Sequence, residues 1–268
     1  IAGLCGNDTA RDAYVRALYN FTLLGSSHLL ADRHIHCVRA LLRLGRDDGE
    51  LLGVTWEHIF RALTDIYRLH QVWEGMARNE RKISKANERA AKKAERNSSD
   101  GSKSADTDDE SDTSSDMSDY FDVRLEEEMD KRMIDEANAM FVHNTIPLDL
   151  VDSIFQRSTS LSRRSLKEFV YQLCRVSRME ISGYGGHVGS NANDIDLTND
   201  HYMKHHTLSD AKHGSSVMGV SSTQPAIYSL EKLVEVTHFN MESRPRLIFA
   251  DIWGTISTHL TSTALHEE

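Results

Sequence analysis

The sequence contains few residues that would break helices, cross-link the chain or carry it across a membrane. Only three prolines and three cysteines occur in 268 residues, and no apolar run reaches the ~18 residues that suggest a membrane span. The cysteines Cys5, Cys37 and Cys174 are far apart and odd in number, which predicts a reducing compartment without a disulfide framework. Because prolines and alternating β-branched runs are both scarce, the sequence predicts an all-α chain.

Apolar residues are also scarce, because two long segments are almost entirely polar. Hydrophobic residues make up 39% of the chain, against roughly 45–50% in an average globular domain. Residues 97–119 are rich in serine and aspartate, and residues 183–224 are rich in glycine, serine, asparagine and histidine. Neither segment has enough apolar surface to offset the entropy lost on ordering, so we expect both to be disordered.

The net charge of −10 argues against one class of partner, because nucleic-acid-binding chains usually carry a general basic surface. We therefore expect that the chain does not bind nucleic acid. One local run is nevertheless basic, and it comprises Arg78, Arg81, Lys82, Lys85, Arg89, Lys92, Lys93 and Arg96. Such runs are usually solvated helices that continue into a linker, which is the interpretation we favour. The alternative is docking on acidic lipid or on the acidic residues that follow.

The remaining sequence has the 3.6-residue period of amphipathic helices. We expect helices at residues 8–24, 29–44 and 120–143, and further helices that begin after Thr55, at Pro147 and after Ser160 or Ser162. Trp56 belongs to the clearest apolar stripe and Phe169 to the stripe of a later helix, so both are predicted core residues. Within 120–143 the expected stripe consists of Leu125, Met129, Met133, Ala137 and Met140.

Residues 228–253 predict a hairpin of two amphipathic helices joined by a short polar elbow. Pro225 suits the first turn of one helix, and Pro245 opens the other. The predicted core residues of this hairpin are Leu233, Phe249 and Trp253. We expect Trp253 to pack against Leu233 or Val234.

Three polar residues of the elbow, Asn240, Arg244 and Arg246, are candidates for a partner contact. An asparagine amide can satisfy free backbone groups at helix ends, so a purely structural cap is the interpretation we favour over a partner contact. The arginines would suit acidic surfaces or phosphates on a partner.

Several motifs in these helices resemble the large Arf guanine-nucleotide exchange factors of the brefeldin A-inhibited kind. Ser229–Glu235 reads S-L-E-K-L-V-E, and Asn240-Met241, Arg244-Pro245-Arg246 and Ile252-Trp253 follow it. Earlier matches are Arg11–Leu18, Asp48–Ile59 (D-G-E-L-L-G-V-T-W-E-H-I), Asp152–Leu161 (D-S-I-F-Q-R-S-T-S-L) and Phe169–Glu180 (F-V-Y-Q-L-C-R-V-S-R-M-E). The elbow departs from the family pattern by an extra residue, Glu242 or Ser243, by Pro245 in place of isoleucine, and by Phe249 in place of tryptophan.

The resemblance covers residues 9–72, 147–182 and 226–253, and it implies an armadillo/HEAT-like stack of helical hairpins. In that family this region follows the catalytic Sec-seven domain, so the resemblance implies a non-catalytic regulatory segment without a cofactor. The implied partners are small GTPases of the Arf or Rab type, other domains of the parent chain, and the peripheral surface of trans-Golgi and endosomal membranes, reached from the cytoplasm. A related trafficking scaffold without exchange activity is an alternative.

The expected domain organisation alternates helical and polar parts. Helical repeats occupy residues 1–72 and 120–182, a basic and then acidic linker occupies 73–119, a polar insert occupies 183–224, and the last hairpin occupies 225–268. The sequence begins with Ile1 rather than methionine, and we expect it to be a fragment of a longer protein.

A metal-dependent enzyme is the remaining alternative, because four histidines lie close together at His201, His205, His206 and His213. His201 and His205 have the i, i+4 spacing of helical zinc ligands. The surrounding sequence has no helical period and no glutamate in the zincin position. We therefore favour a histidine-rich loop and predict no metal site.

Overall fold

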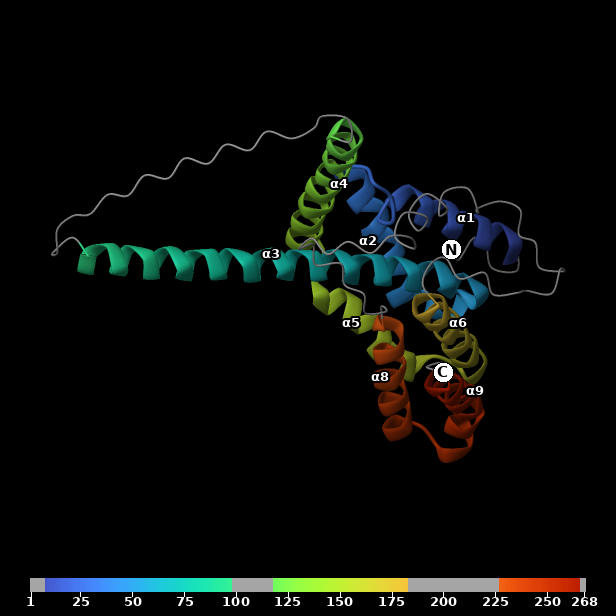
Figure 1. The fold of residues 1–268 in the computed structure, drawn as a ribbon. Coiled ribbons are helices and arrows are strands. Elements are labelled where there is room, and N and C mark those ends of the chain that lie inside the picture. Colours follow the sequence, from blue (N-terminus) through green and yellow to red (C-terminus); the bar gives the residue numbers. More distant parts are fainter. Residues whose placement is uncertain (1–7, 98–117, 183–226, 266–268) are drawn as a thin grey trace. The chain divides into compact units, whose positions relative to one another are not determined.

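The computed structural model describes residues 8–97, 118–182 and 227–265, and these residues form an all-α fold (Figure 1). Its helices are α1 (Asp8–Thr22), α2 (Asp32–Asp47), α3 (Trp56–Asn97), α4 (Ser118–Thr145), α5 (Leu148–Gln156), α6 (Arg163–Ile181), α8 (Tyr228–Ser243) and α9 (Arg246–Ala264). Short 3-10 turns, η2 (Gly49–Leu51), η3 (Gly53–Thr55) and η4 (Arg157–Ser160), connect some of them. The predicted all-α class of helical hairpins is confirmed.

Some expectations concern residues outside the described ranges. The acidic segment falls there apart from its ends, and so do the polar insert at 183–224 with its four histidines and Pro225. Among the helices that the structure describes, none combines the length and the apolar character needed to cross a membrane.

The chain divides into two compact units. The first unit contains the residues up to Thr22, His36–Thr64 and the residues from Leu148 onward, and the second contains Leu23–Ile35 and Asp65–Pro147. Helices α2 and α3 each contribute one part to each unit.

Four aromatic rings form the centre of the first unit. Trp56 stacks on Phe60 with ring centroids 5.2 Å apart, and Phe169 of α6 meets both rings edge-on at 4.7 and 4.9 Å. Phe155 of α5 stacks on Phe60 at 6.1 Å, and all four side chains are at most 1% exposed. Offset and edge-on ring pairs add to the hydrophobic gain from burial. Trp56 and Phe169, expected in the core, are therefore buried at its centre.

Two glycines before α3 allow this core to close. A Cβ atom on Gly49 would lie 3.0 Å from side-chain atoms of both Leu161 and Trp56, so a larger residue would push these groups apart. Gly53 has a φ of +51°, a left-handed conformation that favours glycine. The glycines of the Asp48–Ile59 motif thus serve close packing and a turn that bulkier residues would strain.

The last hairpin packs against α6, and α8 and α9 are joined by a short connection (Figure 1). The buried face of α8 contains Ser229, Leu233, Val236 and Asn240. Leu233 is 0% exposed, as expected, whereas Val234 is 54% exposed. The buried face therefore includes two polar residues that the apolar pattern could not place there.

The expected burial of Trp253 was wrong, because this side chain is 46% exposed. Helix α9 buries Ile252, Ile256 and His259, a face rotated away from Trp253. Phe249 is only half-buried and stacks on Trp253, with ring centroids 5.9 Å apart. Because His259 bonds Ser177 of α6 at 3.0 Å, a polar residue takes part in choosing the face that packs inward.

In the second unit, α4 contacts the segment before α2 and also α3, through a face that the sequence did not predict. Asn138 accepts a bond from the N–H of Leu30 at 2.8 Å and donates one to the carbonyl of His28 at 2.9 Å. His143 stacks on Trp73 with a centroid separation of 3.4 Å.

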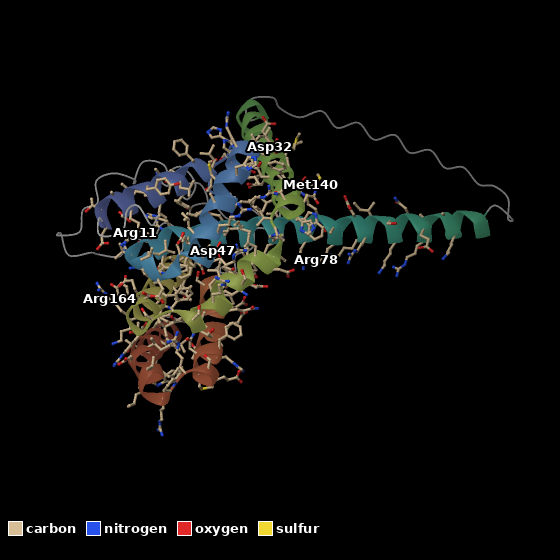
Figure 2. All side chains as sticks on the ribbon, turned by 180° about the vertical axis from the view of Figure 1, so that it is seen from behind. Arg11, Asp32, Asp47, Arg78, Met140 and Arg164 are labelled. Carbon is tan, nitrogen blue, oxygen red and sulfur yellow. The ribbon has the colours of Figure 1, made fainter. Side chains whose placement is uncertain are left out.

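The methionine stripe of α4 faces outward. Met129, Met133 and Met140 are 62%, 63% and 53% exposed, while the buried residues are Asn138, Ala139, Val142 and Ile146 (Met140 is labelled in Figure 2). The prediction that this stripe packs inward was therefore wrong, because the opposite side of α4 is buried. Asn138 explains the difference, since its two backbone bonds require the opposite face to point inward.

Replacement of Phe169 by alanine should lower the free energy of unfolding by about 3–5 kcal/mol, because it leaves a cavity among three aromatic rings. Replacement of Trp253 by alanine is the matched control, and its effect should stay below about 1 kcal/mol because the ring is half-exposed. Urea unfolding followed by circular dichroism measures both. Equal losses in the two variants would contradict the assignment of core and surface.

Candidate partner interface on the last helical hairpin

The elbow between α8 and α9 is short and its backbone is restricted. Arg244 is extended, with φ −116° and ψ 150°, and Pro245 follows at φ −55° as the residue that precedes α9. The carbonyl of Pro245 accepts the first bonds of α9, from the N–H groups of Ile248 and Phe249. Since proline presets φ near this value and lacks an N–H, it suits a helix start. The departure from the family pattern at Pro245 is compatible with a helix that begins here.

Asn240 lies inside the hairpin and not on its surface. Its side chain is 0% exposed, and its Nδ2 donates to Ser158 Oγ at 2.9 Å and to the carbonyl of Val236 at 2.8 Å. Its Oδ1 accepts from Nε of Arg244 at 2.7 Å. These contacts correct the expectation of a partner contact at Asn240, because the amide is fully used within the chain.

Arg244 is also occupied by the chain itself. Its Nη2 lies 2.9, 2.8 and 2.5 Å from the carbonyl oxygens of Ser158, Thr159 and Leu161, at the end of η4. The last carbonyls of a helical segment lack internal partners and carry partial negative charge, so a guanidinium there is favourable. Arg244 therefore acts as a clamp between η4 and the elbow, and the expected partner contact is corrected for this residue too.

Arg246 remains available to a partner, since it is exposed at the first turn of α9. Trp253 follows seven residues later and thus projects from the same side of the helix. Phe249 and Ala250 lie between them, and Leu247 beside them is 83% exposed. We call Arg246, Phe249, Ala250 and Trp253 the outer face of α9. It combines a cation with two stacked aromatic rings on a helix whose other face is buried.

Lys232 links the hairpin to α5, although the sequence analysis did not single it out. Its Nζ lies 3.0 Å from Asp152 Oδ1, 3.0 Å from Glu235 Oε2 and 5.5 Å from the centre of the Phe155 ring. Burial works to lower the pKa of Lys232, but hydrogen bonds to Glu235 and Asp152 raise it above the ordinary value. The lysine of the S-L-E-K motif is therefore a structural ion-pair partner.

Glu180 is the buried carboxylate of this region, and it ties three helices together. It accepts bonds from the backbone N–H and the hydroxyl of Ser229 at 2.9 and 2.6 Å, and its Oε1 lies 2.5 Å from Thr64 Oγ1. Helix α8 has no side-chain cap of its own at Ile227, so Glu180 satisfies one of its free N–H groups. Burial raises the pKa of Glu180, and the hydrogen bonds from Ser229 and Thr64 only partly oppose this.

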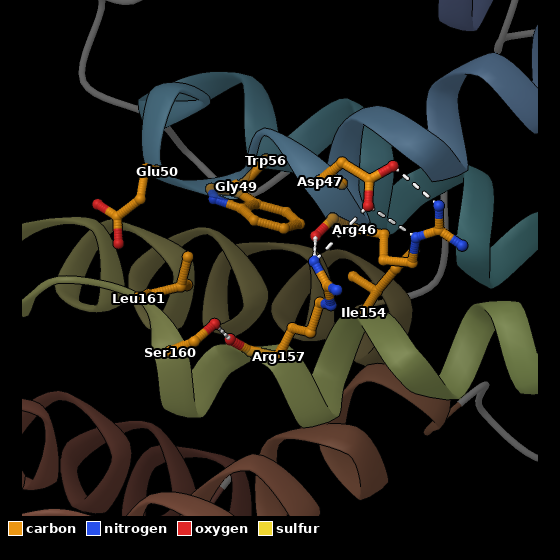
Figure 3. A pocket seen from close by; sticks show the side chains of 10 residues that line it. Arg46, Asp47, Gly49, Glu50, Trp56, Ile154, Arg157, Ser160 and Leu161 are labelled. Atoms are coloured by element: carbon orange, nitrogen blue, oxygen red, sulfur yellow. Dashed lines mark hydrogen bonds and ion pairs between the residues drawn. The ribbon is translucent and has the colours of Figure 1, made fainter.

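A small pocket of about 70 Å³ lies beside the aromatic core (Figure 3). Asp47 on its wall pairs with Arg46 at 2.8 Å and with Arg157 at 3.6 Å, and the hydrogen bond from Arg46 lowers the pKa of Asp47. Ligand sites usually measure roughly 300–1,000 Å³, so this pocket is too small for a cofactor. Within the described part of the chain, no three histidine, cysteine or acidic residues gather as metal ligands.

Replacement of Arg244 by glutamine should lower the free energy of unfolding by about 2–3 kcal/mol, because it removes charged hydrogen bonds to three carbonyls. The same replacement at Arg246 should change it by no more than about 0.5 kcal/mol, since that side chain is exposed. Urea titration of the two variants beside the parent measures this difference. A loss at Arg246 as large as that at Arg244 would refute the division of roles.

Replacement of Glu180 by glutamine should change how stability depends on pH. Folding raises the pKa of Glu180, so the folded protein holds this proton more tightly than the unfolded chain does. The resulting stabilisation is fully present below the pKa of the unfolded chain and is lost as pH rises through the pKa of the folded protein. Compared with the parent, the glutamine variant should therefore gain stability as pH rises from about 5 to about 7.5. The buried histidines are the same in both proteins, so their titration cancels in the difference. A difference in unfolding free energy that is constant with pH, or that moves in favour of the parent, would overturn this.

The residues that the sequence analysis missed were all within its motifs. Ser158 belongs to the Asp152–Leu161 motif, Glu180 ends another, and Lys232 lies in a third. Each of them is a polar residue in a motif that also contains apolar residues, and this position could have marked it as a buried contact.

Comparison with known proteins gives related sequences along nearly the whole chain, although no protein-family model matches it. The chain is 24% identical over 273 residues to brefeldin A-inhibited guanine nucleotide-exchange protein 4 of Arabidopsis thaliana, an alignment that covers 100% of the chain and 14% of that protein. It is 26% identical over 261 residues to protein 2 of the same name from that plant, covering 93% and 12%. It is 25% identical over 256 residues to the ADP-ribosylation factor guanine nucleotide-exchange factor sec72 of Schizosaccharomyces pombe, covering 96% and 11%.

The chain thus spans only 11–14% of the length of these relatives. Residues of the motifs that carry the resemblance contact one another in the structure, as Asn240 does Ser158, Ser229 does Glu180 and Lys232 does Asp152. On these grounds the chain is similar, along nearly its whole length, to a segment of guanine nucleotide-exchange proteins of the brefeldin A-inhibited kind.

Proposed function

We propose that this chain is a non-catalytic regulatory and scaffold segment of a large Arf exchange factor, and that it binds a small GTPase of the Arf or Rab type through the outer face of α9. The observation that carries the proposal is the position of exposed Arg246 and Trp253 on one side of α9, while Ile252, Ile256 and His259 on another side are buried. One relative is named as an exchange factor for ADP-ribosylation factor, which supports this class of partner.

The outer face of α9 has the composition of an interface centre. Tryptophan and arginine are enriched among the residues that carry most binding energy. The opposite side of α9 is held on α6, where Asp251 pairs with Arg163 and lies 3.5 Å from Lys167. With the elbow clamped by Arg244, the helix offers a pre-ordered surface, which reduces the entropy lost on binding.

The proposal assigns the exchange reaction to another part of the parent protein, because this chain spans 11–14% of its relatives. Contact of the same face with other domains of the parent would make the segment autoinhibitory until a GTPase competes for it. The setting that we propose is the cytoplasmic side of trans-Golgi and endosomal membranes, where the GTPase would recruit the protein to vesicle formation.

Charge reversal of Arg246 to glutamate should lower the association rate constant for a GTP-loaded Arf protein, and the difference from the parent should be largest at low salt. The reason is that exposed interface charges act mainly on association. Trp253→Ala should weaken binding by about 30-fold, or ~2 kcal/mol, as expected for an anchor at an interface centre. Surface plasmon resonance with GTP-loaded and GDP-loaded Arf measures both effects.

The matched control is Arg164→Glu, which reverses an exposed charge on α6 outside the outer face of α9 (Arg164 is labelled in Figure 2). It should bind as the parent does. Nucleotide release from Arf should keep its uncatalysed rate when the chain is added. Equal binding by the parent, R246E and W253A would reject the proposed face, and accelerated nucleotide release would reject the non-catalytic role.

A further inference from the structure

The part of α3 that follows its packed segment is a fully exposed basic helix. From Arg78 to Lys92 every residue is exposed, whereas the earlier residues Leu69 and His70 are buried in the second unit. We call residues 78–92 the basic arm. It carries six cations and two glutamates, and Figure 2 shows its side chains extending from the helix beyond the labelled Arg78.

The six cations of the basic arm lie on one side of the helix. At 3.6 residues per turn they fall within an arc of about 100°, and at 1.5 Å per residue the stripe is about 21 Å long. Its members are Arg78, Arg81, Lys82, Lys85, Arg89 and Lys92.

Little of this positive charge is neutralised within the helix. Glu80 falls on the opposite side, and Glu88 lies at the edge of the stripe, where it pairs with Lys92 at 2.6 Å. Arg78 Nη2 comes only within 3.9 Å of the Glu74 carboxylate, and Nε of Arg78 donates to the backbone carbonyl of Glu74 at 3.2 Å. Exposed pairs of this kind contribute little stability, so the cations are available to another anionic surface.

The shape and composition of the basic arm favour an anionic lipid surface over other polyanions. A straight stripe of point charges matches the plane of a bilayer, to which basic residues next to anionic headgroups are attracted. The arm contains no aromatic residue on which single-stranded bases could stack. Its far side is mainly alanine and asparagine with Ile83, so it has no broad apolar face for deep insertion.

We propose that the basic arm of α3 binds the anionic surface of a lipid bilayer through its cationic stripe, lying on the headgroups without deep insertion. This deepens the proposed recruitment role by assigning a lipid contact that is separate from the GTPase face on α9. Binding is electrostatic and weakens as salt screens the charges.

The test is flotation of the full 268-residue chain with vesicles of phosphatidylcholine that contain about 30% phosphatidylserine. The chain should bind these at least ~100-fold more tightly than pure phosphatidylcholine vesicles, and binding should fall steeply between about 50 and 500 mM NaCl. Replacement of all six stripe cations by glutamine, which retains helix propensity, should reduce binding by at least ~30-fold.

A second variant keeps composition and net charge but moves three cations off the stripe. It exchanges Arg78 with Asn87, Ile83 with Lys85 and Arg89 with Ala91, and it should lose at least ~10-fold in binding. Circular dichroism at 222 nm checks that both variants remain helical.

The outcomes separate this inference from the proposed function. Vesicles without GTPase should bind R246E and W253A as well as the parent, so failure at α9 leaves the lipid result intact. Equal binding by the parent and the exchange variant, absence of binding to anionic vesicles, or tighter binding to a short DNA duplex than to vesicles would each overturn the inference.

Discussion

The last hairpin depends on a small polar clamp between η4 and the elbow. Asn240 and Arg244 bond the hydroxyl and the carbonyl of Ser158, and Arg244 also reaches the carbonyls of Thr159 and Leu161. Buried polar groups stabilise a fold only when they are satisfied, and a satisfied network also restricts the geometry it permits. This clamp therefore fixes the elbow from which α9 begins.

The same logic connects motifs that are far apart in the sequence. Lys232 pairs with Asp152, and Glu180 bonds the first residues of α8 through Ser229. Each contact joins a residue of one motif to a residue of another about 50 to 80 positions away. The motifs that carry the family resemblance thus meet in one packed surface between α5, η4, α6 and α8. The polar residues in them have structural roles that require no partner.

Neighbouring cations have different roles because their surroundings differ. Arg244 and Arg246 are two residues apart, yet the first meets three carbonyl oxygens and the second is exposed on α9. The basic arm extends the principle, since its cations have few anionic neighbours. In each case the availability of a charge to a partner is decided by whether the chain already supplies its counter-charge or acceptor.

The sequence by itself determined the helices, because a 3.6-residue period and scarce prolines leave little choice of secondary structure. It also identified Trp56, Phe169 and Leu233 as buried, since each lies centrally in an apolar stripe. Tertiary structure alone decided which side of α4 and α9 packs inward, and which polar residues join Leu233 on the buried side of α8. Polar residues such as Asn138, Asn240 and His259 turn those helices by finding hydrogen-bond partners on other elements, and such partners are invisible to a pattern that counts apolar residues along one helix.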